Sequence, residues 1–315
     1  MSSASNPSRS AAAVEPPRGI ERVSPSRWLR ISAWASFALN VTIIATGGAV
    51  RLTGSGLGCP QWPLCAPGSL VPTEELSYHS LIEFGNRTIS GPILLFAVLV
   101  AILSWRLRAE RRDLTVLSSI VLVLVLLQAL VGGVIVWMHL DANLVGFHYI
   151  VSLLLVCITA AYLVRLHEPP LPRERAVPKP FAVLAHVATL FMAITVFVGV
   201  LTTGAGPHSG DANIARDGFD ASLLAHIHAW PGYILFGLTL ALVVWASRSR
   251  LRPLAWLAAL IAVELVQIAV GVYQARSGLP PLAVGVHMVL ASLAAASMTV
   301  VVLRLKRPVA VPPEA

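Results

Sequence analysis

The protein has 315 residues, of which 56% are hydrophobic and only 12% are charged, and its formal net charge is +8. Its mean hydropathy is +0.76. Soluble domains contain about 25% charged residues, so this composition excludes an ordinary soluble enzyme. The apolar residues form uncharged runs of about 20 residues, the length at which a helix spans a bilayer. Because these runs lack the alternation of a transmembrane barrel, they predict an all-α polytopic membrane protein.

Eight transmembrane helices are predicted in chain order. Their ranges are 31–50, 81–105, 114–137, 144–164, 181–203, 223–245, 254–274 and 282–303. The first 25 residues are rich in Ser, Pro and Ala, and the chain ends on VAVPPEA. Both ends are expected to be disordered because they contain too little apolar surface to form a core.

The distribution of positive charge predicts the orientation in the membrane. If the N-terminus is cytoplasmic, all Lys and Arg residues except four lie on the cytoplasmic side; the exceptions are Arg51, Arg87, Arg216 and Arg276. The positive-inside rule then places both termini in the cytoplasm of a multi-pass protein of the cell membrane. This topology accounts for the excess of positive charge. Membrane lipid is therefore the expected environment, and nucleic acid is not a predicted partner.

The sequence contains an internal repeat. Gln128 precedes His148 by the same interval as Gln267 precedes His287, and a Val-Gly pair follows each Gln. Two homologous four-helix bundles are therefore expected, related by a pseudo-two-fold axis along the membrane normal because each half has an even number of spans. The predicted parts are a disordered cytoplasmic tail (1–30), an N-terminal bundle (31–166), a cytoplasmic linker (167–180), a C-terminal bundle (181–305) and a cytoplasmic tail (306–315).

Polar residues inside the membrane are costly, so each one is a candidate functional residue. His148 and His287 lie near the outer ends of spans 4 and 8, and span 6 carries His226 and His228 at a similar depth. A single intramembrane His more often bonds to a neighbouring helix, but a repeat-matched pair favours the two axial positions of a haem iron. His226 and His228 are about 200° apart on a helix, so only one of them faces the bundle interior. The sequence leaves open which one does.

The N-terminal half differs from this pattern. Asn86 stands where a second His would be expected, so a haem there would have one strong ligand, His148. Such a site suits a ligand that is exchanged or transformed. Glu83, near Asn86, either forms an ion pair with Arg87 or Arg51 or acts on the substrate by moving protons or stabilising a developing cation. Both arginines are candidates to bind haem propionates.

Three further residues are notable. Cys59 and Cys65 lie in the first outer loop, where an oxidising compartment favours a disulfide that either staples the loop or has a redox role. Glu264 lies inside span 7, and the sequence assigns it no role.

The segment TGGAVRLTGSGLGCPQWPLC, followed by IEFGNR and by the histidines of spans 4 and 8, resembles the haem A synthase family over residues 30–305. The resemblance implies oxidation of the C8 methyl group of haem O to a formyl group, giving haem A for cytochrome oxidase. It implies a haem b (iron) cofactor in the C-terminal half and haem O as the substrate in the N-terminal half. Asn86 departs from the family pattern, because many members have His at that position.

The resemblance also implies residue roles. These are His228 and His287 as haem b ligands with His226 as the alternative, His148 for the substrate haem, Glu83 as the functionally required carboxylate, and Cys59 with Cys65 as the outer cysteine pair.

Two other functions remain as alternatives. A di-haem cytochrome b that only transfers electrons is disfavoured by the missing second His at Asn86. A haem transporter is disfavoured because no spans are broken at matched mid-membrane depth; the segments 90–92 and 230–232, which contain Gly and Pro, lie nearer the outer ends. The expected partners are a haem O synthase, by family analogy, and an electron-transfer protein. The oligomeric state is left open, with a homo-oligomer as one alternative.

Overall fold

The computed structural model describes residues 25–73, 77–208, 210–211 and 218–309. The described residues form eight long helices and one small sheet. Their bounds are α1 Arg27–Leu52, α2 Tyr78–Trp105, α3 Arg112–Trp137, α4 Ala142–Leu166, β1 Arg173–Arg175, α5 Lys179–Ala205, α6 Ala221–Arg248, α7 Leu254–Arg276, α8 Pro281–Arg304 and β2 Lys306–Pro308.

Each of the eight helices is long and apolar enough to cross a membrane, which confirms the predicted all-α polytopic architecture. The helices exceed the predicted spans by a few residues because polar groups extend their ends. For example, α1 begins at Arg27, where the hydroxyl of Ser26 accepts a hydrogen bond from the Leu29 backbone N–H. Such a cap satisfies a donor that the first helical turn leaves free.

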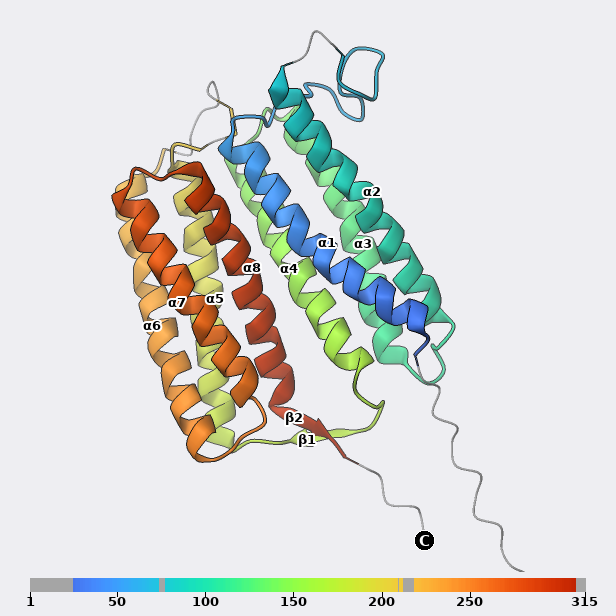
Figure 1. The fold of residues 1–315 in the computed structure, drawn as a ribbon, viewed down its shortest axis with the longest axis vertical. Coiled ribbons are helices and arrows are strands. Elements are labelled where there is room, and N and C mark those ends of the chain that lie inside the picture. The colour runs from blue at the N-terminus through green and yellow to red at the C-terminus, as the bar shows by residue number, and fades with distance from the viewer. Residues whose placement is uncertain (1–24, 74–76, 209, 212–217, 310–315) are drawn as a thin grey trace, which may run out of the picture.

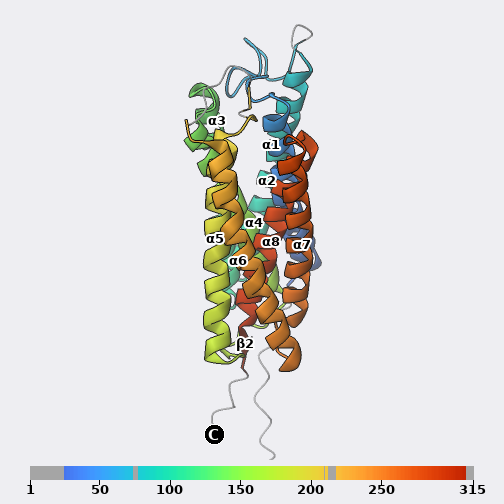
Figure 2. The same ribbon diagram turned by 90° about the vertical axis from the view of Figure 1, so that its left-hand side faces the viewer.

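The helices form two side-by-side groups, α1–α4 and α5–α8 (Figure 1). Within each group, consecutive helices pack together and the first helix packs against the fourth. Between the groups, α8 packs against α1 and α4, and α4 packs against α5. The turned view shows the helices running along the long axis of the molecule (Figure 2). The core at the junction contains Ile44, Leu153, Val156 and Ala296.

One end of the molecule, called the upper end here, is where α1, α3, α5 and α7 finish and the even-numbered helices begin (Figure 1). The long connection between α1 and α2 lies there. At the opposite, lower end, β1 pairs antiparallel with β2, with Glu174 opposite Arg307. Glu168 bonds to Arg304 at 2.8 Å and to Arg173 at 3.1 Å. The interhelical linker is therefore tied to the C-terminal end of α8.

This sheet was not predicted, because the sequence suggested only a linker at 167–180 and a tail at 306–315. Three residues of each segment instead form a strand, since pairing satisfies backbone groups that neither segment could satisfy alone. The disorder predicted for the two ends falls largely on residues 1–24 and 310–315, which lie outside the described residues.

Candidate functional site

The predicted site residues of both halves lie near the upper end. Glu83 and Asn86 are in the first three turns of α2, and His148 is in the second turn of α4. His228 and His287 occupy similar positions on α6 and α8. Because the even-numbered helices all begin at the upper end, similar distances from their starts put these side chains at a similar depth.

In the C-terminal group, His228 and His287 face each other. Their ring centroids are 6.2 Å apart and the rings are nearly perpendicular. The Nδ1 atom of His228 makes a 2.9 Å hydrogen bond with the carbonyl oxygen of Thr195 on α5. His226 is exposed, and its Nδ1 bonds instead to the Ser222 carbonyl oxygen of its own helix. The structure therefore brings His228, and not His226, to His287.

Glycines lie directly behind both imidazoles. A Cβ atom at Gly199 of α5 would lie 2.8 Å from Cε1 of His228, and one at Gly271 of α7 would lie 3.1 Å from Cε1 of His287. Any larger residue would push the rings away from their present positions. Sequence reasoning did not assign a role to these glycines, although the repeated Val-Gly pair was a signal for Gly271.

His148 has a similar environment in the N-terminal group. A Cβ atom at Gly132 of α3 would lie 3.7 Å from its Cε1 atom. Its backbone carbonyl accepts a 2.8 Å hydrogen bond from the side-chain amide of Gln128. The Nδ1 atoms of His148 and His287 are both buried without a hydrogen-bond partner among the described residues. Buried polar atoms are normally paired, so both imidazoles have unused bonding capacity.

Asn86 is the structural counterpart of His228. Each lies on the second helix of its group against a glycine of the first helix. A Cβ atom at Gly47 would lie 3.8 Å from Oδ1 of Asn86, and one at Gly199 would lie 2.8 Å from Cε1 of His228. The side-chain oxygen of Asn86 accepts a 2.7 Å hydrogen bond from the hydroxyl of Thr46. The N-terminal group therefore holds one imidazole and one amide where the C-terminal group holds two imidazoles.

Glu83 is almost fully buried, at 4% exposure. Its Oε2 atom accepts a 2.7 Å hydrogen bond from the backbone N–H of Cys59, and its Oε1 atom accepts one from Nε of Arg87 at 3.1 Å. Of the two readings of Glu83, the ion pair with Arg87 is present in the structure. The carboxylate thus connects α2 to the loop that carries Cys59.

Arg87 holds the same loop through its guanidinium group. It donates to the carbonyl oxygens of Cys59 at 2.7 Å and of Gln61 and Leu64 at 2.9 Å. These hydrogen bonds occupy guanidinium N–H groups of Arg87, which the sequence suggested as donors to a haem propionate. Arg87 is therefore built into the loop, although it remains 20% exposed at the side chain.

The predicted disulfide between Cys59 and Cys65 is present. Within its loop, the Trp62 ring packs so closely on α3 that a Cβ atom at Gly133 would clash with it at 2.5 Å. Trp62 also contacts Trp137 edge-on, with ring centroids 5.5 Å apart. The disulfide loop is thus fixed to α2 through Glu83 and Arg87 and to α3 through Trp62.

Arg51 links the two groups at the upper end. Its Nε donates to the carbonyl oxygen of His208 at 2.6 Å, and its Nη2 donates to that of Thr203 at 2.8 Å. Nearby, the Gly56 N–H donates to the Gly210 carbonyl oxygen. The sequence suggested Arg51 as an anion-binding residue, and the structure shows in addition that it joins the end of α1 to the end of α5.

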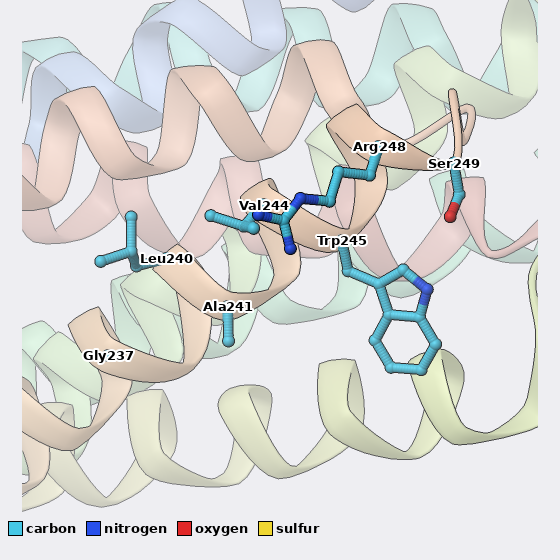
Figure 3. Close-up of a pocket in the computed structure, with 7 residues that line it drawn as sticks. All are labelled: Gly237, Leu240, Ala241, Val244, Trp245, Arg248 and Ser249. Carbon is cyan, nitrogen blue, oxygen red and sulfur yellow. The ribbon is translucent and has the colours of Figure 1, made fainter.

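A depression on the surface of α6 lies away from these residues (Figure 3). Its lining comes from the lower part of α6 and the turn that follows it, including Leu240, Trp245 and Arg248.

Among the described residues, no cluster of three or more His, Cys, Asp or Glu side chains could hold a metal ion. Two facing imidazoles suit instead the axial positions of a haem, whose porphyrin supplies the remaining ligands.

The chain is similar to several known proteins. Residues 30–299 match the model of a family described as Cytochrome oxidase assembly protein. A heme A synthase of Bacillus cereus is 30% identical over 181 residues, which is 56% of this chain and 56% of the relative. Heme A synthases of Alkalihalophilus pseudofirmus (28% identical, covering 69% of this chain and 77% of the relative) and Exiguobacterium sibiricum (33%, covering 39% and 41%) also match.

The matched segment thus spans about half the length of the Bacillus cereus relative. The family model, in contrast, covers α2 to α7 completely, most of α1 and α8, and every residue of the site described above. The chain belongs to the Cytochrome oxidase assembly protein family, COX15-CtaA.

Proposed function

We propose that the protein is a haem A synthase, an oxidoreductase that converts the C8 methyl group of haem O to a formyl group and so provides haem A for cytochrome oxidase. The observation that carries this proposal is the pair of unlike sites at one depth. In the C-terminal group two imidazoles, His228 and His287, face each other. In the N-terminal group a single imidazole, His148, lies near the start of α4, and Asn86 and Glu83 lie near the start of α2. A resident cofactor and an exchangeable substrate require such different sites.

The C-terminal site would hold haem b through His228 and His287. Their ring centroids are 6.2 Å apart, so both imidazoles could serve as ligands of one haem iron. The hydrogen bond from His228 to the Thr195 carbonyl would fix the ring orientation, as second-shell bonds do for metal ligands. Gly199 and Gly271 leave the rings the space they need. When bound, haem b would supply one-electron transfer.

The N-terminal site would hold the substrate haem through His148. Asn86 is bonded to Thr46, and an amide is a much weaker iron ligand than an imidazole. Single strong ligation allows haem O to enter and haem A to leave. Conversion of a methyl group and a water molecule to a formyl group releases electrons and protons in equal number, so a nearby group that handles protons or positive charge is required.

Glu83 is the residue proposed for that task. It lies one helical turn above Asn86 on α2, and the Cys59 N–H and Arg87 hold its carboxylate in a fixed position. A preorganised carboxylate stabilises a developing positive charge without having to reorganise during the reaction. In this proposal the disulfide of Cys59 and Cys65 acts as a staple that keeps the Cys59 N–H directed at Glu83.

The topology follows from the charge distribution. We infer that both termini are cytoplasmic and that the upper end, with both sites, faces outwards. A haem O synthase would supply the substrate, and an electron-transfer partner would take up or provide electrons. The transporter alternative gains no support, since α2 and α6 continue as unbroken helices through Pro92 and Pro231.

The test is to identify the haem that each half retains. Protein expressed together with a haem O synthase is purified as wild type, His287→Ala, His148→Ala and His226→Ala, and the extracted haems are identified by mass. We expect His287→Ala to lose haem b, His148→Ala to lose haem O and its oxidised products, and the exposed His226→Ala to keep both. If His287→Ala and His148→Ala each lose unmodified haem b, the protein would instead be an electron-transferring cytochrome.

A further inference from the structure

A buried carboxyl group lies deeper in the C-terminal bundle than the histidine pair. Glu264 of α7 is 5% exposed, and its Oε1 atom accepts a 2.9 Å hydrogen bond from the hydroxyl of Thr239 on α6. Thr239 is fully buried. The Oε2 atom of Glu264 is buried without a hydrogen-bond partner among the described residues. Glu264 lies near the middle of a membrane-spanning helix, where a carboxyl group is expensive to keep.

The fold itself does not require a polar group there, because the N-terminal bundle has apolar residues at the corresponding positions. The register that matches Gln128 with Gln267 places Val125 at the position of Glu264. The register that matches Asn86 with His228 places Ala97 at the position of Thr239. Val125 and Ala97 are both buried in one apolar cluster. The carboxyl–hydroxyl pair is therefore specific to the half with two imidazoles.

Glu264 is connected to the histidine site through one face of α7. Glu264, Gln267 and Gly271 are spaced i, i+3 and i+7, which places them on the same side of the helix. Gln267 donates a 3.1 Å hydrogen bond to the His287 carbonyl oxygen, and Gly271 lies behind the His287 ring. At 1.5 Å per residue, Glu264 lies about 10 Å below Gly271. The Oε1 atom of Gln267 is also buried without a partner among the described residues.

We propose that Glu264 is a proton-binding residue of the C-terminal site, which takes up one proton when the site gains one electron and releases it when the electron leaves. This inference rests on the proposed function, in which haem b occupies that site. The proton forms an O–H bond at the carboxylate of Glu264 and returns to water on reoxidation. The electron comes from oxidation of the substrate methyl group, which releases protons in equal number.

The physical reason is the low polarity of the bundle interior. An electron added there is not screened by water, so its interaction with a nearby charge is stronger and acts over a longer distance than in solution. Protonation of the carboxylate removes one negative charge as the electron adds one, so the net charge of the bundle stays constant. Thr239, as a donor to Oε1, favours the ionised carboxylate of the oxidised state.

Few other side chains could take this proton. Among the described residues of α6, α7 and α8, Glu264 is the sole carboxylic acid. The other titratable groups are the paired His228 and His287, which serve as ligands in the proposed function, the exposed His226, Tyr233 and Tyr273, and the helix-end arginines Arg248, Arg276 and Arg304.

The experiment is a redox titration of the purified holoprotein at a series of pH values, with the haem b absorbance as the readout. Because reduction is coupled to the uptake of a proton, the midpoint potential should fall as the pH rises. The steepest expected slope is about 59 mV per pH unit, which corresponds to a tenfold change in the reduction equilibrium. Glu264→Gln cannot bind the proton and should give a potential nearly independent of pH. The exposed Glu110→Gln is the matched control and should behave like wild type.

Two further variants sharpen the test. Glu264→Val introduces the residue type that the N-terminal bundle has at this place, so it should fold and also lose the pH dependence. Thr239→Val removes the hydrogen bond that favours the ionised carboxylate, so the pH-dependent range should move to higher pH. A pH dependence that persists in both Glu264 variants, or a wild type without any, would overturn the proposal.

A second measurement detects the protonation of Glu264 directly, by infrared spectroscopy. The reduced-minus-oxidised infrared spectrum of wild type should gain a carboxylic acid carbonyl band that shifts in D₂O, and this band should be absent from Glu264→Gln. Protein that contains haem b and forms haem A but lacks the band would refute this inference and leave the proposed function intact. Protein that binds no haem b would refute both.

Discussion

The side-chain amide of Gln128 donates a hydrogen bond to the backbone carbonyl of His148, and the same contact joins Gln267 to His287 in the other half. In each half the glutamine lies on the third helix and the histidine on the fourth, with a glycine behind the imidazole. This repeated contact fixes the height of both histidines at the upper end of the bundle. At the level of these histidines the halves therefore differ on the second helix, where His228 corresponds to Asn86.

The first prediction concerns Glu83. Replacing Glu83 with Ala should leave both haems bound, because none of the three proposed iron ligands is changed, but formation of haem A should fall roughly 10²-fold or more. Conversion of haem O to haem A in membranes, measured by mass analysis, is the assay. Glu83→Gln retains an acceptor for the Cys59 N–H. A similar loss of haem A formation in this variant would therefore show that the negative charge of Glu83 is required, and not only its contact with the loop. Normal turnover in both would remove Glu83 from the mechanism.

The second prediction concerns the glycine behind His228. In Gly199→Ala the new Cβ atom would lie 2.8 Å from the imidazole, so the ring must move and strain its hydrogen bond to Thr195. We expect a lower haem b content and an altered haem spectrum. Gly237→Ala is the matched control, since no atom lies within 4 Å of its Cβ position; it should keep the haem and gain about 0.5–1 kcal/mol of helix stability. Equal haem content in the two variants would contradict the proposed site.

The third prediction concerns Asn86. Asn86→His would place a second imidazole in the N-terminal group opposite Gly47, as His228 lies opposite Gly199. The substrate haem should then bind more tightly and show the absorption spectrum of two-imidazole ligation. Equilibrium binding of haem O to wild type and variant measures the effect. If the affinity and spectrum do not change, Asn86 does not face the substrate iron.

Much of this arrangement could be predicted from the sequence because it depends on local composition and spacing. The apolar runs indicated all eight helices, the two outer cysteines indicated the disulfide, and the repeat placed His148 and His287 at the same depth. The choice between His226 and His228 depends on which face of α6 packs inwards, which the spacing alone did not decide.

Contacts between segments far apart in the chain could not be predicted from the sequence either. The bond from Cys59 to Glu83 and the bonds from Arg51 to the end of α5 join residues whose proximity follows from the tertiary structure. The same holds for the pairing of β1 with β2. In each case the residue types allowed several partners, and packing selected one.

The fourth prediction concerns the disulfide loop. Replacing Cys59 and Cys65 together with Ser removes the cross-link that closes a short loop, so stability should fall by about 2 kcal/mol. The Cys59 N–H should also be held less firmly against Glu83, so haem A formation should decrease while haem b is retained. Thermal unfolding and haem analysis of the same preparation check both effects. Full activity in the double variant would show that Glu83 and Arg87 hold the loop without the disulfide.

The central claim is that one chain carries a resident haem b and oxidises a second haem. The most direct measurement is extraction and mass analysis of the haems from wild-type protein produced together with a haem O synthase. The account predicts haem b together with haem O, hydroxylated haem or haem A. Two unmodified haem b molecules per chain would contradict it and identify the protein as an electron-transferring cytochrome.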